Sequence, residues 1–132
     1  GKPYLDGGCS CKIPYQWAID QGFEKIVVIK TRHADYRKNL KKASETSLAH
    51  RIYHPHPEFA RVLEQSDAAY NHQCDELEQL AKEGRIYLVS PSVPMKISRL
   101  EKDMEKLGHL YARGYKDAKD QMEQLKAYLG MK

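Results

Sequence analysis

The sequence predicts an α/β protein that contains more helix than strand. Three short runs of strand-type residues are separated by longer stretches in which apolar residues recur every three or four positions. The chain has 132 residues, 41% of them hydrophobic, which is enough for one domain with its own core. We therefore expect a single unit over residues 1–132, with a strand-turn-helix-strand segment at 1–37 and a helix-rich region at 38–132.

The N-terminal segment predicts a β-α-β unit. We expect the end of a short strand at residues 4–5, followed by a turn at the Asp-Gly-Gly sequence of residues 6–8, because glycine adopts backbone angles that other residues avoid. A proline near the start and a glycine after the end favour a short helix at 14–22. Residues 25–31 are a mainly β-branched run, typical of a central strand covered on both faces.

The remaining chain is predicted to be mostly helical. Residues 38–56 are the least regular stretch, and helical spacing then predicts a long helix at 57–84. A third strand is expected at 85–90, ended by two prolines, and a helical pattern follows at 100–129. For that last segment the candidate caps are Ser98 and Asp103, and the candidate breaks are Gly108 and Gly114.

Three strands are too few for a complete parallel sheet. A buried parallel strand needs neighbours on both of its edges, and only three short candidates stand against four or five helical segments. The first residues also begin inside an expected strand. We therefore expect the chain to be the C-terminal piece of a longer protein.

Composition excludes several classes of protein. Three cysteines at uneven spacing (Cys9, Cys11 and Cys74) do not indicate a secreted disulfide framework. No apolar run reaches the length of about 20 residues that a membrane span needs, and the N-terminus lacks the pattern of a signal peptide. The net charge of +4 is spread among acidic residues, so it does not indicate a nucleic-acid partner. We expect a cytoplasmic protein.

A specific set of residues is shared with a known family. Its members within residues 4–38 are Tyr4, Asp6-Gly7-Gly8, Ile13-Pro14, Ala18, Gly22, the strand at 25–29, Thr31-Arg32 and Tyr36-Arg37-Lys38. This segment resembles the surroundings of the catalytic aspartate in patatin-like phospholipases, which are serine hydrolases. The rest of the chain is similar to the tail of the bacterial branch of that family, in which a Tyr-Asn pair (here Tyr70-Asn71), a proline-rich strand end and a Leu-x-x-x-Tyr-x-x-Gly-Tyr stretch recur.

The resemblance implies both a fold and a reaction. The fold would be a three-layer α/β/α sandwich, of which this chain forms the C-terminal part. The reaction would be hydrolysis of a phospholipid or another acyl ester by a serine paired directly with an aspartate, without metal or organic cofactor. Asp6 would be that aspartate, and Gly7 and Gly8 would turn the backbone so that the carboxylate faces the nucleophile. The alternative is an ordinary turn aspartate bonded to its own backbone.

The serine nucleophile itself is missing from the sequence. No Gly-x-Ser-x-Gly motif occurs among the 132 residues. The sequence Gly-Cys-Ser-Cys-Lys at 8–12 begins like that motif but ends in lysine and follows Asp6 too closely, so Ser10 is expected to be a loop residue. We expect this chain alone to have no esterase activity. The alternative function is a non-catalytic, helix-rich interaction module that keeps a remnant of the hydrolase fold.

Metal binding is not expected. Cys9 and Cys11 are not followed by a second ligand pair at the spacing of a zinc site. His72 and Cys74 are two residues apart, so on a helix they point in different directions. Lys12 would lower the pKa of Asp6 if it turned inward. We expect the Lys12 side chain to point to solvent.

A run of basic residues is a candidate lipid contact. Such a face could touch the anionic head groups of a membrane peripherally, although a run of this kind is usually a solvated face. Its members are Lys30, Arg32, Arg37, Lys38, Lys41 and Lys42.

Overall fold

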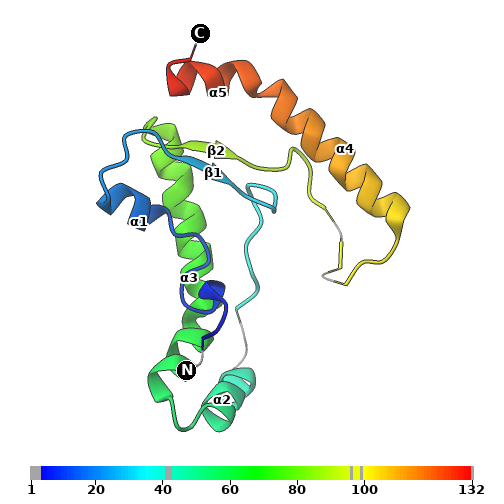
Figure 1. Ribbon diagram of the computed structural model, residues 1–132. Helices are drawn as coiled ribbons and strands as arrows, with labels where there is room; N and C mark the ends of the chain where they lie inside the picture. Colours follow the sequence, from blue (N-terminus) through cyan, green and yellow to red (C-terminus); the bar gives the residue numbers. More distant parts are fainter. Residues whose placement is uncertain (1–3, 41–42, 96, 99, 132) are drawn as a thin grey trace.

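The computed structural model describes residues 4–40, 43–95, 97–98 and 100–131. It is a mixed structure, 55% helical, with one small parallel sheet, which confirms the general α/β class (Figure 1). Its elements in chain order are η1 (Gly7–Cys9), α1 (Tyr15–Asp20), β1 (Val27–Ile29), α2 (Ala43–Ile52), α3 (Pro57–Lys82), β2 (Tyr87–Val89), α4 (Met104–Asp120) and α5 (Met122–Leu129).

The sheet consists of β1 and β2, which run parallel. Val27 pairs with Tyr87, and Ile29 pairs with Val89. The long helix α3 lies between the two strands in sequence and forms the axis of the structure, with α2 at one end and the sheet near the other (Figure 1). Pro57 starts α3 at a position that needs no hydrogen-bond donor, and Gly84 follows its end with a φ of 71°. The predicted helix at 57–84 is confirmed.

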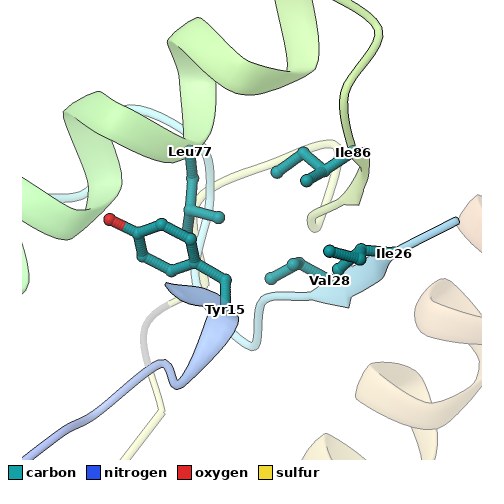
Figure 2. Packing of buried hydrophobic residues seen from close by; sticks show 5 residues of the cluster. All are labelled: Tyr15, Ile26, Val28, Leu77 and Ile86. Carbon is teal, nitrogen blue, oxygen red and sulfur yellow. The ribbon is translucent and has the colours of Figure 1, made fainter. Parts of the chain in front are cut away.

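The core joins α1, α3 and the sheet. Its buried side chains point toward one another from elements that are distant in sequence (Figure 2). Leu77 of α3 is fully buried in this core. Tyr15 lies at the edge of the core, and its hydroxyl donates a hydrogen bond to Glu76. The five members are Tyr15, Ile26, Val28, Leu77 and Ile86.

Two expectations about the strands differ from the structure. Tyr4 and Leu5 are not in a strand and are 85% and 66% exposed, because no described strand lies where their backbone could pair. The expected coverage of both faces of the first strand is not met by the described residues of this chain. Val28 is buried in the core, whereas Ile29 is 74% exposed. One face of β1 therefore packs on the core and the other is open.

The C-terminal helical region divides at a different place from the one expected. Asp103 caps α4, because its carboxylate accepts from the backbone N–H groups of residues 105 and 106. Neither Gly108 nor Gly114 breaks the helix. The chain instead turns at Gln121, whose carbonyl accepts a hydrogen bond from the Tyr87 hydroxyl at 3.3 Å. Within the described part of the chain, no helix combines the length and apolarity required to cross a membrane.

Candidate functional site

Asp6 begins the short 3-10 helix η1. Its Oδ1 accepts a hydrogen bond from the Gly8 backbone N–H at 2.7 Å, and its carbonyl accepts from Cys9 N–H at 3.0 Å. The predicted turn is present, although neither glycine in it has a positive φ. A Cβ at Gly8 would lie only 3.1 Å from Asp6 Oδ1, so the absence of a side chain there gives the carboxylate room. This bonding is that of the turn aspartate considered as the alternative.

The same aspartate also borders an open cavity. The cavity has a volume of about 1040 Å³, and its walls come from three parts of the chain. One wall is η1 and the residues after it, the second is the segment that follows β1, and the third is one side of α3. The polar members of the last two walls are Thr31, Arg32, Tyr36, Lys38, Ser66, Asp67 and Tyr70.

A buried carboxylate with two lysines lies in the cavity wall. Asp67 Oδ1 is 2.6 Å from Lys38 Nζ and 3.7 Å from Lys12 Nζ, and the Asp67 side chain is only 14% exposed. Burial is the largest single effect on the pKa of Lys38 and lowers it, but the hydrogen bond to Asp67 and the other favourable contacts together raise the pKa above its ordinary value. The expectation that Lys12 points to solvent is wrong, because the Asp67 carboxylate attracts it into the cavity.

Two tyrosines and two cations form the adjoining wall. The Tyr36 and Tyr70 rings meet edge to face with centroids 6.2 Å apart. The Arg32 guanidinium lies 5.2 Å from the Tyr36 centroid, and the Lys38 ammonium lies 5.6 Å from the Tyr70 centroid. The pKa of Tyr70 is raised to about 12, mainly by burial and secondly by a hydrogen bond with Cys74. The Tyr70 hydroxyl is therefore neutral at pH 7 and can donate a hydrogen bond.

Helix α3 holds the segment that carries these cations. The Asn71 side chain accepts from Lys38 N–H at 2.7 Å and donates to the Lys38 carbonyl at 2.9 Å. Arg37 forms salt bridges with Asp75 and Glu78 at 2.6 and 2.7 Å, and the hydrogen bond to Glu78 is the main cause that raises its pKa. The backbone of residues 37–38 is thus fixed against α3.

These contacts correct the view of the basic residues as a solvated face. Arg37 and Lys38 are bonded to carboxylates, and Lys30 is only 6% exposed. Arg32 lies over an aromatic ring. Lys41 and Lys42 lie outside the described residues. Contact of these residues with a lipid surface stays a prediction.

Ser10, His72 and Cys74 are the remaining candidates from the sequence. Ser10 is exposed and donates its hydroxyl to the Gly7 carbonyl at 3.0 Å, as expected of a loop residue. His72 is exposed on α3 while Cys74 is fully buried, which confirms that the two point in different directions. Within the described residues, no three His, Cys, Asp or Glu side chains lie close enough to hold a metal ion.

Sequence reasoning found part of this site. It singled out Asp6, and the pattern that carries the family resemblance contains six more residues that line the cavity: Gly8, Thr31, Arg32, Tyr36, Lys38 and Tyr70. It missed Asp67 as the partner of two lysines. A signal was present, because Asp67, Asn71 and Glu78 recur at helical spacing and mark a polar stripe on α3.

Comparison with known proteins gives one family. Residues 56–130 match the family model described as "Domain of unknown function (DUF6363)". The match covers more than half of the chain and extends from the residue before α3 to the residue after α5. Asp6 lies outside it. No curated protein and no solved structure matches the chain.

Proposed function

The chain belongs to the DUF6363 family, and on the separate ground of the sequence resemblance described above we propose that it is the C-terminal part of a patatin-like hydrolase of lipid esters. Asp6 would be the aspartate of a serine-aspartate pair, and the serine would lie on a part of the protein outside these 132 residues. The substrate class would be phospholipids or other acyl esters. The complete fold would be a three-layer α/β/α sandwich to which β1 and β2 contribute two strands.

One observation carries the proposal. Asp6 shares a cavity with Thr31, Arg32, Tyr36 and Lys38, all of which belong to the pattern that resembles the patatin-like segment. The four residues lie up to 32 positions from Asp6 in sequence, yet they line the same cavity. An aspartate that only stabilised its own turn would not need them as neighbours. The cavity is open, which leaves room for a serine and a substrate.

The chemistry follows from what Asp6 and its neighbours offer. The Asp6 carboxylate would take the proton of the serine hydroxyl while the serine oxygen bonds to the ester carbonyl carbon. The same proton would pass to the departing alcohol, and water would then release the acid and restore the serine. Lys12, Arg32 and Lys38 lie on the cavity wall and would attract an anionic head group.

The open face of β1 also supports the proposal. Val27 and Ile29 are apolar and exposed, at 36% and 74%, which is unusual for neighbouring side chains of one parallel strand. In a complete sandwich, further elements of the protein would cover this face. The unpaired edge of a two-stranded sheet would likewise receive a further strand.

The proposal predicts an inactive chain and an active longer protein. The purified chain of 132 residues should not hydrolyse a short p-nitrophenyl ester above a heat-treated control, because it has no Gly-x-Ser-x-Gly serine. The full-length protein should hydrolyse that ester, and a fluorophosphonate, which reacts with activated serines, should label it at a serine upstream of Gly1. Ester hydrolysis by the chain alone, or a full-length protein that is neither active nor labelled, would contradict the proposal.

A second candidate is a helix-rich interaction module without catalysis. Exposed apolar side chains on α4 favour it, since Met104, Tyr111 and Tyr115 are 77%, 75% and 64% exposed. The reading frame directly upstream of Gly1 separates the two candidates. A glycine-rich turn followed by Gly-x-Ser-x-Gly favours the hydrolase, whereas an unrelated domain or a start codon favours the module.

A further inference from the structure

A second cavity lies between α4 and the segment that follows β2. Its volume is about 400 Å³, and its apolar wall includes Pro91, Met95, Ile97 and Leu110. An adjoining hollow of about 410 Å³ shares Met95, Ile97, Leu110 and Arg113 with the first, and Lys106 and His109 also line it. Pockets of a few hundred cubic ångströms suit small ligands. The two hollows together form a trough whose wall is more apolar than polar, which we name the α4 trough.

The first hollow of the α4 trough carries most of its positive charge, and Arg113 lines both hollows. Lys30, Arg32 and Arg113 all line the first hollow. Lys30 is only 6% exposed, and its ammonium makes a single hydrogen bond, to the Ala34 carbonyl at 3.3 Å. An ammonium has three donors, so two of them have no partner among the described residues. A buried cation in this condition is costly unless an anion or polar group completes it.

No described carboxylate serves as that anion. Asp117 is the one acidic residue on the wall of the first hollow, and both of its oxygens are bonded to Ser92, at 3.0 Å to the backbone N–H and 2.7 Å to the hydroxyl. Arg113 forms no salt bridge with any described residue. Through these bonds Asp117 fixes the segment after β2 against α4. Lys30, Arg32 and Arg113 carry three positive charges on this wall, against the single negative charge of Asp117.

We infer that the α4 trough binds a single-chain lipid anion, with a carboxylate or phosphate head at Lys30, Arg32 and Arg113 and the hydrocarbon chain along Met95, Ile97 and Leu110. The charged end supplies donors for an anion, and the apolar wall supplies contacts for a chain. A sugar phosphate or nucleotide would leave several polar groups facing apolar side chains without partners. The inference does not involve Asp6, although Arg32 lines both this trough and the cavity beside Asp6. The variants below are therefore placed at residues that do not line the Asp6 cavity.

The first test compares three probes on the purified protein. Palmitate, lysophosphatidate and neutral monopalmitoylglycerol are titrated separately by calorimetry, each below the concentration at which it forms micelles. At least one anion should bind, at least about tenfold more tightly than the neutral lipid, because the ionic contacts are lost in the latter. Tighter palmitate identifies a carboxylate head, and tighter lysophosphatidate a phosphate head. Absence of binding by both anions, or equal binding of the neutral lipid, would overturn the inference.

The second test fills the trough with a side chain without destabilising the fold. Gly114 lies on α4 at the trough wall, and a Cβ there would meet no atom within 4 Å. Gly108 has the same open surroundings on the same helix but does not line either hollow. Leucine favours helix more than glycine does, so G114L and G108L should both raise the melting temperature. G114L should weaken anion binding at least about tenfold, and G108L should stay within about twofold.

A third pair of variants tests the charged end. Arg113→Gln should weaken anion binding about tenfold, because it removes a charged donor from the trough. Lys119→Gln removes the same charge from an exposed position on α4 that lines neither hollow, and should leave binding within about twofold of the unsubstituted protein. Unchanged binding in both G114L and Arg113→Gln would show that the ligand binds elsewhere.

Discussion

Asp6 combines a structural contact with an accessible charge. Its Oδ1 holds the Gly8 N–H at 2.7 Å, while the side chain borders the open cavity. The other carboxylate oxygen has no partner among the described residues. A local hydrogen bond and a role in chemistry are therefore compatible, since one oxygen can orient the group while the second accepts a proton. The hydrogen bond within the turn uses only one of the two carboxylate oxygens of Asp6.

Asp117 gives a residue-scale prediction about pH. Hydrogen bonds from the backbone and hydroxyl of Ser92 lower its pKa, so its contribution to stability is present above the unfolded value of about 3.9 and is lost as the pH falls through the folded value. Asp117→Asn should lower the free energy of unfolding by about 1 kcal/mol at pH 7. The difference from the unsubstituted protein should shrink below about pH 4.

Urea unfolding at several pH values measures this difference. Asp120→Asn is the matched control, because Asp120 lies on the same helix but is exposed and paired only with Lys116 on the surface. Its effect should be small and should vary little with pH. A loss of stability in Asp117→Asn that is the same at pH 7 and pH 3 would contradict the assignment.

At the scale of elements, α3 positions the site. Five of its side chains, at 67, 70, 71, 75 and 78, contact residues 36–38 and fix the segment after β1. The sequence predicts α3 itself, because its apolar spacing is long and regular. The sequence does not predict that the polar side chains of α3 bind residues 36–38, because this depends on the path that the chain takes after β1.

Asn71 tests this arrangement. Asn71→Ala leaves the Lys38 N–H and carbonyl without their partners and should lower the free energy of unfolding by about 1–2 kcal/mol, after the gain in helix propensity is included. Gln79→Ala on the same helix removes only an exposed bond to Glu83 and should change stability by less than about 0.5 kcal/mol. Equal denaturation midpoints for the two variants would contradict the role of Asn71.

Short elements were predicted less well than long ones. Residues 4–5 look like a strand end, but a strand exists only where a neighbour supplies hydrogen bonds, and none is described there. The β-branched run at 25–31 does form a strand, although a shorter one, and the sequence does not reveal that one face is open. In both cases the missing information concerns neighbours and not local preference.

At the scale of the whole molecule, the cavity next to Asp6 brings together distant segments. Lys12 and Asp67 form a salt bridge across 55 positions of sequence, and Asp6 lies beside residues of α3. Neither spacing nor periodicity can predict such a contact. The resemblance pattern contains several members of the cavity wall, although the local sequence gives no reason for them to lie together.

The most direct test of the hydrolase account is the turnover of the full-length protein with Asp6→Asn. Asparagine keeps the acceptor for the Gly8 N–H, so η1 and the thermal stability should be preserved, while the charge that would accept the serine proton is lost. Asp20→Asn is the control, since Asp20 is exposed, bonded only to Gln16, and outside the cavity wall. We expect kcat for ester hydrolysis to fall by about three orders of magnitude or more in Asp6→Asn and to stay unchanged in Asp20→Asn. Turnover in Asp6→Asn equal to that of the unsubstituted enzyme would remove Asp6 from the mechanism.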